Sequence, residues 1–214
     1  MLVKDVMKKN PVTVSPDTPV PEAKSIMTRQ RINKLPVIDK NGAVVGILTR
    51  NDLIKASPSD ATTLDMFELS YLLSRLTVER AMQKNVKTVS ENETVEEAAR
   101  LMEDYGIGCL PVMRGELLVG IITESDLFRT FIDFFSTHEP GARATFVLDE
   151  KPGQLTGICK ALADFNSNIV SIVTILTTDA AHRRVTVKAS GISKEQFAKI
   201  IESCGAQLED IRNV

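Results

Sequence analysis

Two short segments of the chain carry residues that could bind a nucleotide. In each, a threonine stands three residues before an aspartate: Thr49 before Asp52, and Thr123 before Asp126. A carboxylate can accept hydrogen bonds from both ribose hydroxyls, and a phosphate is favoured at a helix N-terminus by unpaired N–H groups and the helix dipole. The same Thr-x-x-Asp spacing also serves as an ordinary helix cap, so a purely structural role is the alternative.

These two segments belong to an internal repeat. Residues 3–53 align with residues 78–127, and 21 of the aligned positions are identical. The Leu-Pro-Val at 35–37 recurs at 110–112, with an offset of 75 that falls to 74 after the following turn. A repeat of this size predicts two copies of one structural unit.

Each copy has the pattern of a β-α-β-β-α unit. After a first short strand, apolar residues at spacings of three and four predict a helix, as in Val20, Ala23 and Met27. Two β-rich runs follow, joined in the first copy by Asn41-Gly42, a pair typical of hairpin turns. The second helix begins at the threonine of the Thr-x-x-Asp pattern.

The repeated unit resembles the CBS motif, named for cystathionine β-synthase. The resemblance implies an α+β fold in which motif 1 (residues 1–56) and motif 2 (residues 77–135) pack as a pseudo-twofold pair. The leucine-rich residues 57–76 between them are predicted to form a connecting amphipathic helix. It also implies a regulatory protein that binds AMP, ADP or ATP, with no catalytic residues and no required cofactor.

In CBS proteins the nucleotide is held by the first strand, by the segment around Leu-Pro-Val and by the Thr-x-x-Asp segment. Carried over to this chain, the implied nucleotide contacts are Val12, Ile32, Lys34, Pro36, Thr49, Arg50, Asn51 and Asp52 from the first copy, and Lys87, Ile107, Cys109, Pro111, Thr123, Ser125 and Asp126 from the second.

The two copies differ in charge at these positions. Lys34 and Arg50 of the first copy correspond to Cys109 and Glu124 of the second, and a glutamate repels phosphate. We therefore predict that the cleft around Asp52 binds the nucleotide more tightly. The alternative is a dimeric interaction scaffold whose clefts have lost their ligands.

Residues 143–214 have a different pattern, β-α-β-β-α-β, which predicts a ferredoxin-like fold. The first helix of this part has an apolar stripe made of Leu155, Ile158, Leu162 and Phe165. Two β-branched runs, a second helix and a last strand follow. Residues 136–142 are predicted to be the linker that precedes this domain.

The segment Asp149-x-x-Pro-Gly-x-Leu, followed by Asn168-Ile169, resembles the ACT domain, which usually senses an amino acid or other small metabolite. The resemblance implies a ligand loop made of Asp149, Pro152, Gly153, Gln154, Leu155, Asn168 and Ile169. Turn formation by Pro-Gly is the simpler interpretation of part of this pattern. The order CBS–CBS–ACT resembles the acetoin utilization protein AcuB family.

Composition excludes several other classes. The 214 residues are 43% hydrophobic, as expected for a globular protein. They include no tryptophan and two tyrosines and have a net charge of −2, which argues against a nucleic-acid-binding protein. No apolar run reaches the roughly 18 residues of a membrane span. Three separated cysteines and two histidines fit neither a disulfide framework nor a metal site. We expect a cytoplasmic homodimer that acts on an unknown target protein, and no enzymatic activity, because no catalytic motif is present.

Overall fold

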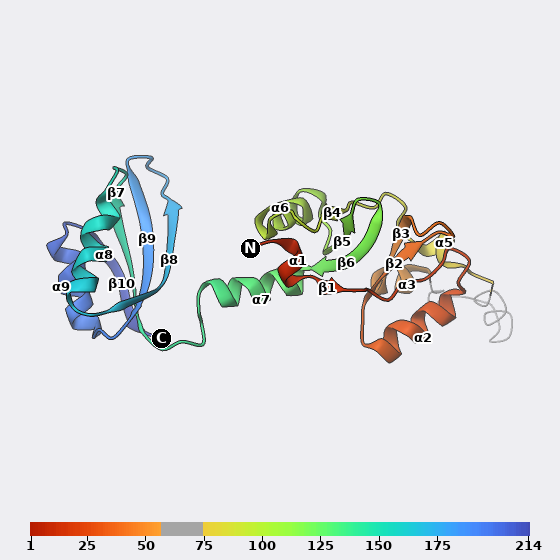
Figure 1. Ribbon diagram of the computed structural model, residues 1–214, viewed down its shortest axis with the longest axis horizontal. Helices are drawn as coiled ribbons and strands as arrows, with labels where there is room; N and C mark the ends of the chain where they lie inside the picture. Colours follow the sequence, from red (N-terminus) through yellow and green to blue (C-terminus); the bar gives the residue numbers. More distant parts are fainter. Residues whose placement is uncertain (57–74) are drawn as a thin grey trace. The chain divides into compact units, whose positions relative to one another are not determined.

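The computed structural model describes residues 1–56 and 75–214, which form two compact units, Met1–Phe128 and Arg129–Val214 (Figure 1). Most of the predicted connecting helix at 57–76 lies outside the described residues. The division into units falls inside one helix, Glu124–Phe134, and not in the predicted linker at 136–142.

The first unit holds both repeats, each with the two predicted helices and the predicted hairpin. Its elements are α1 (Val3–Val6), β1 (Lys8–Lys9), α2 (Val20–Gln30), β2 (Lys34–Ile38), β3 (Val44–Thr49), α3 (Arg50–Ala56), α5 (Val78–Ala81), β4 (Val89–Ser90), α6 (Val95–Tyr105), β5 (Cys109–Arg114), β6 (Leu117–Thr123) and α7 (Glu124–Phe134). The predicted first strand of the first copy is reduced to an isolated bridge between Val14 and Val37, and each repeat also begins with a short helix that was not predicted. The hairpins β2–β3 and β5–β6 are antiparallel, and the turns between them contain Gly42 and Gly115 with positive φ angles of 83° and 60°.

The repeats exchange their first helices. Val3 of α1 is buried in the core of the second repeat, and Val78 of α5 is buried in the core of the first. Lys8 of β1 pairs with Ile121 of β6, and Gln83 makes the corresponding bridge to Ile47 of β3. This reciprocity is what a pseudo-twofold relation predicts. The sequence analysis assigned residues 1–56 to motif 1 and residues 77–135 to motif 2, and it did not predict that the first helix of each motif packs in the other.

Glycines allow the exchanged segments to approach the strands. A Cβ at Gly46 would lie 2.2 Å from the sulfur of Met82, and a Cβ at Gly120 would lie 2.3 Å from the sulfur of Met7. A methyl group fits only if the methionine moves, so the repeated glycine next to the Thr-x-x-Asp segment has a packing role.

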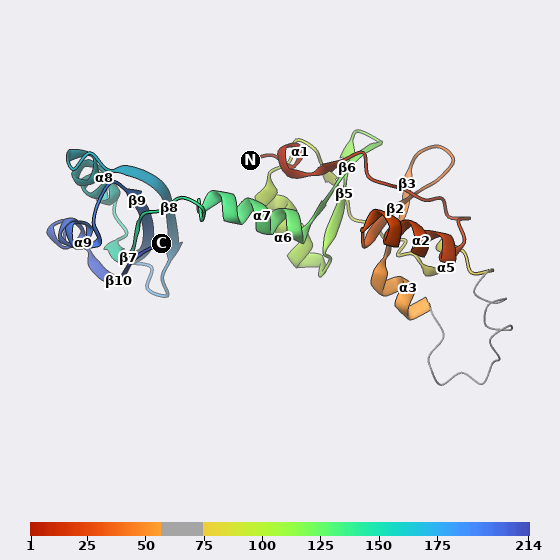
Figure 2. The ribbon, with the colours of Figure 1, turned by 90° about the horizontal axis from the view of Figure 1, so that it is seen from below.

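The second unit has the element order predicted for it. After the end of α7 come β7 (Ala142–Asp149), α8 (Gln154–Asp164), β8 (Asn168–Leu176), β9 (His182–Ser190), α9 (Lys194–Ser203) and β10 (Gln207–Asn213). The strands form an antiparallel sheet in the order β10-β7-β9-β8. Figures 1 and 2 both show α8 and α9 on the same face of this sheet.

The core of the second unit lies between this sheet and its two helices. Phe146 of β7 and Phe197 of α9 are fully buried there, with Ile158 and Leu162 of α8. The prediction that Phe165 completes the buried stripe of α8 is wrong: α8 ends at Asp164, and the Phe165 side chain is exposed.

Candidate nucleotide-binding site

Asp52 is held in place at the start of α3. Its Oδ2 accepts hydrogen bonds from the Thr49 backbone N–H (2.8 Å) and hydroxyl (2.6 Å), and Gln83 Nε2 donates to its Oδ1 (3.2 Å). The Thr-x-x-Asp pattern therefore acts as a helix cap, as the simpler interpretation predicted. Among the described residues, only Gln83 donates to Oδ1. Because a carboxylate oxygen has two lone pairs, the buried Asp52 keeps acceptor capacity with respect to these residues.

A cavity of about 310 Å³ opens beside Asp52 and is built from both repeats. Of the predicted nucleotide contacts, the first repeat contributes Lys34, Thr49, Asn51 and Asp52, and the second contributes Lys87, Ile107, Cys109 and Pro111. The Thr-x-x-Asp segment of one repeat thus faces the Leu-Pro-Val segment of the other. This volume lies within the roughly 300–1,000 Å³ range of small-molecule sites.

Lys34 reaches from β2 into this cavity and donates a hydrogen bond to the Gly108 carbonyl of the other repeat. Lys34 also lines the smaller cavity beside Asp126. In the second repeat, Cys109 occupies the corresponding position. One lysine therefore lies at both clefts, and the second repeat offers no counterpart.

Cys109 is buried and lines the cavity beside Asp52. Burial raises the pKa of its thiol to about 11, the nearby positive charge of Lys34 opposes that rise, and the carboxylates of Glu124 and Asp52 add to it. The side chain therefore stays an uncharged thiol at neutral pH and offers a weakly polar surface, which suits contact with a flat heterocycle better than with a phosphate.

The corresponding cleft beside Asp126 is smaller, at about 220 Å³. Asp126 Oδ2 accepts hydrogen bonds from the Thr123 backbone N–H (2.9 Å) and hydroxyl (2.7 Å), which repeats the geometry of the first cleft. Lys8 stands at the position that Gln83 has in the first cleft. Of the predicted contacts, this cleft brings together Ile32, Lys34, Thr123, Ser125 and Asp126.

Two residues of the charge comparison, the predicted contact Arg50 and the residue Glu124, lie elsewhere than expected. Arg50 lines a different cavity, between α2 and α3, because consecutive helical residues point about 100° apart. Glu124 lines the cleft beside Asp52, not the one beside Asp126. Among the described lining residues, each cleft consequently has one more lysine than it has carboxylates. The two clefts therefore differ in volume and not in this charge balance.

Val12 and Pro36 line neither cleft in the part of the chain that the structure describes. Val12 packs against the core of the first repeat, and Pro36 is buried in β2. Sequence reasoning also missed Ile47, Lys55, Gln83, Asn85 and Val86, all of which line the cavity beside Asp52. The repeat offset identifies Gln83 as the counterpart of Lys8, but only the exchange of segments shows that each faces the other repeat.

In the second unit, a cavity of about 380 Å³ lies where β7 leads into α8. Asp149, Gly153, Gln154 and Leu155 of the predicted ligand loop line it, together with Lys151 and Arg183. The hydrogen bond from Lys151 holds the pKa of the Asp149 carboxyl below its usual range.

Three residues of that predicted loop lie outside this cavity. Pro152 is exposed beside it, and Asn168 and Ile169 lie at the far end of the sheet. Asn168 pairs with Ser190, whereas Asp149 pairs with His182 at the other end of the same strand β9. Adjacent strands run antiparallel, so the start of β8 is one strand length from the loop before α8.

Among the described residues, no cluster of histidine, cysteine and carboxylate side chains could hold a metal ion. The helices of residues 1–56 and 75–214 include none with the length and apolar character needed to cross a membrane.

The comparison with protein families matches the CBS domain model at residues 3–59 and 78–133. The chain therefore belongs to the CBS domain family. A CBS domain-containing protein of Dictyostelium discoideum is 33% identical over 62% of this chain and 92% of its own length. The L-aspartate semialdehyde sulfurtransferase of Methanocaldococcus jannaschii is 34% identical over 61% of this chain, but this chain covers only 23% of that enzyme.

Solved structures with the same fold also match the CBS part of the chain. The CBS domain pair of protein MJ0100, solved with 5′-methylthioadenosine and S-adenosyl-L-methionine, is 35% identical with a TM-score of 0.52, over 61% of this chain and 95% of that one. The Vibrio cholerae protein named for acetoin utilization (AcuB) is 30% identical with a TM-score of 0.53, over 64% and 95%. CBSX2, solved with AMP, is 28% identical with a TM-score of 0.50, over 61% and 96%.

Proposed function

We propose that this chain is a regulatory protein that binds an adenosine nucleotide (AMP, ADP or ATP) in its CBS pair. The cleft beside Asp52 is proposed to bind the nucleotide more tightly than the cleft beside Asp126. The observation that carries the proposal is the cavity of about 310 Å³ that gathers eight of the predicted contacts from the two repeats. The adenosine ligands of related CBS pairs support the ligand class.

The cleft offers a partner for each part of such a nucleotide. Ile107, Cys109 and Pro111 form a weakly polar wall against which adenine could pack. The free acceptor capacity of Asp52 suits a ribose hydroxyl, and Lys55 and Lys87 supply positive charge for phosphate. In the smaller cleft beside Asp126, Ile32 and Lys34 would make the corresponding contacts.

Isothermal titration calorimetry of the full chain with AMP tests the proposal. Asp52→Asn keeps an oxygen for the Thr49 cap but removes the charge, and should weaken AMP binding about tenfold or more, as expected for a charge-assisted hydrogen bond. Asp126→Asn is the matched control, since the Thr123 cap there has the same geometry, and should have a smaller effect on the first binding event.

Three outcomes are decisive. Equal losses from both substitutions would contradict the preference for the cleft beside Asp52. Binding of S-adenosylmethionine or methylthioadenosine but not of AMP, ADP or ATP would keep the site and change the ligand. If no adenosine compound binds the wild-type chain, the protein is better described as an interaction scaffold with degenerate clefts.

The second unit is proposed to be an ACT domain that binds an amino acid or similar metabolite. Its strand order is that of a ferredoxin-like fold, and its cavity of about 380 Å³ holds Lys151 and Arg183 for a carboxylate and Asp149 and Glu150 for an ammonium group. A thermal-shift screen with the twenty amino acids tests this. No shift with any of them would remove the amino-acid part of the proposal.

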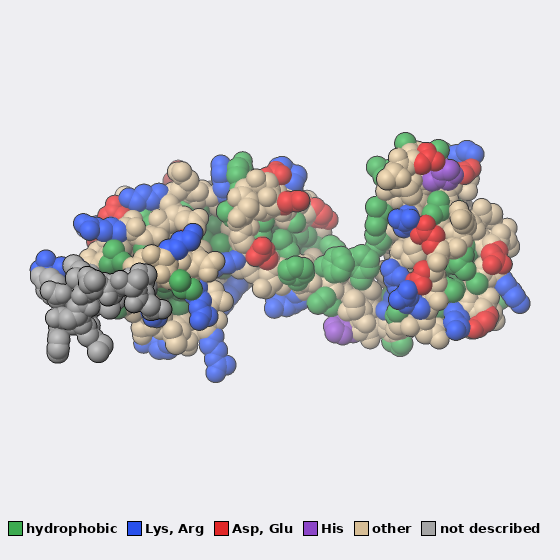
Figure 3. Space-filling model, turned by 180° about the vertical axis from the view of Figure 1, so that it is seen from behind, with side chains coloured by type: hydrophobic (Ala, Val, Ile, Leu, Met, Phe, Trp, Pro, Cys, Tyr) green, Lys and Arg blue, Asp and Glu red, His purple; other side chains and the backbone are tan. Residues whose placement is uncertain are grey.

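We also propose that the chain forms a homodimer. β8 is an edge strand of nine residues whose Ile172, Ile175 and Leu176 are exposed, and such an edge can pair with another strand. Hydrophobic side chains also gather over α7 (Figure 3), where Phe128 is 70% exposed and Phe131 is 56% exposed. Light scattering should give twice the chain mass of 23.5 kDa, and a monomer at micromolar concentration would refute the dimer.

Linkage would turn these sites into a regulatory device. A nucleotide that favours one arrangement of the two CBS repeats shifts the population toward it, by as much as its affinity for the two arrangements differs. If the second unit senses another metabolite, each ligand must change the affinity of the other by the same factor. The target protein would read the resulting state.

A further inference from the structure

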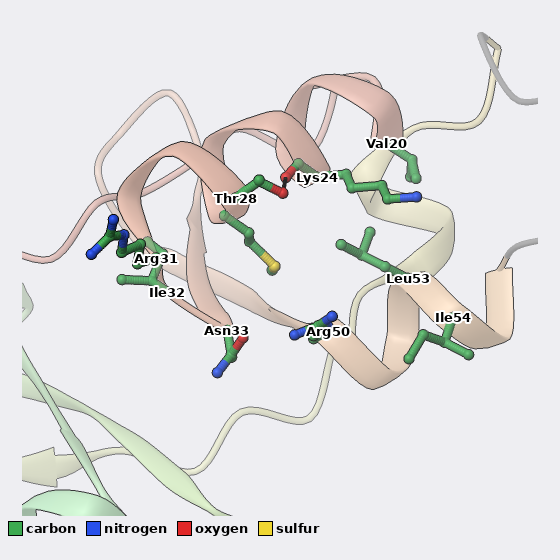
Figure 4. A pocket seen from close by; sticks show the side chains of 10 residues that line it. Val20, Lys24, Thr28, Arg31, Ile32, Asn33, Arg50, Leu53 and Ile54 are labelled. Atoms are coloured by element: carbon green, nitrogen blue, oxygen red, sulfur yellow. Dashed lines mark hydrogen bonds between the residues drawn. The ribbon is translucent and has the colours of Figure 1, made fainter.

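A second cavity of the first unit lies between α2 and α3 and has a volume of about 520 Å³. It is larger than either cleft beside the two aspartates. Figure 4 shows Lys24 and Thr28 on the α2 side, Leu53 and Ile54 on the α3 side, and Arg50 where α3 begins. Arg31 lies at the end of α2, on the rim.

The charged side chains among the described residues that line this cavity are all basic. Three cations line it, Lys24, Arg31 and Arg50, and none of the described lining residues has a carboxylate. Within residues 1–56 and 75–214, none of the three forms an ion pair or a side-chain hydrogen bond. Like charges around one cavity repel each other unless an anion lies between them.

The second repeat shows that the fold does not need these cations. At the positions of Lys24, Arg31 and Arg50 it has Ala99, Gly106 and Glu124. The two repeats otherwise form corresponding helices and hairpins and share most of their buried apolar residues, so the basic residues are a property of the first repeat and not of the unit that both form.

Arg31 is present despite an unfavourable backbone conformation. It ends α2 in the left-handed region, at φ 53°, where its counterpart Gly106 ends α6 at φ 61°. Glycine adopts this conformation at no steric cost, whereas a long side chain is disfavoured there. A residue kept in an unfavourable conformation points to a role for its side chain.

The floor of the cavity is apolar. Val20, Met27 and Leu53 are buried beneath it, and Ile32 and Ile54 flank it. A ligand that satisfies both surfaces must combine an anionic group with an apolar body. Arginine pairs well with both carboxylate and phosphate because its planar donors match their oxygens.

We propose that the cavity between α2 and α3 binds a small amphipathic organic anion, with its carboxylate or phosphate near Arg50 and its apolar part against Leu53 and Met27. The site is separate from the two nucleotide clefts, although Ile32 and Asn33 also border the cleft beside Asp126. The proposal does not depend on adenosine binding.

Calorimetry of the full chain with hexyl phosphate, hexanoate and inorganic phosphate tests this proposal. Hexyl phosphate or hexanoate should bind, and inorganic phosphate should bind at least tenfold more weakly, because it lacks the apolar part. Binding of only one of the two amphipathic probes would identify the anionic group as phosphate or carboxylate. Failure of both would overturn the proposal.

Variants that restore the second repeat's residue locate the site. Arg50→Glu and Lys24→Ala should each weaken the probe about tenfold, whereas Arg29→Ala, which removes an exposed cation of α2 outside the cavity, should not. Arg31→Gly should weaken the probe while leaving the melting temperature unchanged or raised, because glycine accepts the left-handed conformation. A parallel loss of stability and binding in Arg31→Gly would indicate a structural role and contradict the assignment.

Saturation with AMP separates this site from the nucleotide clefts. The probe should still bind when AMP is saturating, and Asp126→Asn should not affect it. If AMP displaces the probe, or if Asp126→Asn abolishes its binding, the cavity is an extension of the nucleotide cleft and the proposal of a separate site is wrong.

Discussion

Replacing Gly120 by alanine is expected to destabilise the first unit by about 1–3 kcal/mol, the usual range for overpacking a filled core. The added Cβ would lie 2.3 Å from the Met7 sulfur and 3.1 Å from the Lys8 carbonyl oxygen. The methionine can rotate away, but the carbonyl cannot move easily because β1 is paired with β6 at this point, Lys9 opposite Gly120.

Gly46 is the matched comparison in the first repeat. The three atoms that a Cβ there would meet all belong to the flexible Met82 side chain, at 2.2, 2.9 and 3.2 Å. A rotation of Met82 relieves the contact, so Gly46→Ala should cost less than Gly120→Ala. The difference measures how firmly the exchanged segment holds its backbone, since both glycines face a methionine at the equivalent position of the repeat, Met82 or Met7.

Urea unfolding followed by tyrosine fluorescence can report on the first unit through Tyr105 of α6, because the chain has no tryptophan and no tyrosine after residue 128. With a slope of about 2 kcal/mol/M, a loss of 1–3 kcal/mol lowers the midpoint by roughly 0.5–1.5 M. Met7→Ala combined with Gly120→Ala should show a favourable coupling. An unchanged midpoint in Gly120→Ala, or a larger loss in Gly46→Ala, would refute the packing argument.

Three further predictions concern single side chains. Because its pKa is about 11, the Cys109 thiol should have a thiolate fraction of about 10⁻³ at pH 8, and iodoacetamide should alkylate it more slowly than Cys159 and Cys204. Lys34→Met removes the charge that opposes the rise of this pKa and should slow the alkylation further. Mass spectrometry of the peptides measures the three rates. Phe197→Ala removes a fully buried ring from the second unit and should cost about 3–5 kcal/mol in a thermal or urea titration, unlike Phe165→Ala at an exposed site. The hydrogen bond from Arg114 lowers the pKa of Glu91. The ionised Glu91 therefore stabilises the folded state above the usual glutamate pKa, and this stabilisation disappears as the pH falls through the lowered pKa. Arg114→Gln should reduce the loss of unfolding free energy that is measured between pH 6 and pH 3.

The repeated unit could be predicted from the sequence because its signals are local. Hydrophobic spacing located α2 and α6, and the identity of Asp52 and Asp126 as first-turn residues followed from the repeat itself. The charge environment of the clefts could not be predicted in this way. Arg50 is next to Thr49 in sequence but lines another cavity, and Glu124 contributes to the cleft of the other repeat.

The same limit applies to the second unit. The apolar spacing of Ile158 and Leu162 predicted their burial correctly, and Ser193 and Gln196, at the spacing of a capping box, form both hydrogen bonds of that motif. Phe165 fits the spacing too, but the helix ends one residue earlier, and helix ends depend on tertiary context that spacing does not contain.

Because the first helices are exchanged, each structural half of the first unit is built from two segments that are not adjacent in the sequence. Residues 1–9 complete the half of the unit that begins about seventy residues later, so deleting them should damage motif 2 more than motif 1. A fragment cut between the repeats would leave each half without one helix and with an unpaired strand edge. Two such fragments expressed together would recover the missing contacts from each other, as in a split protein. The exchange thus ties the two halves together more strongly than the connecting chain alone.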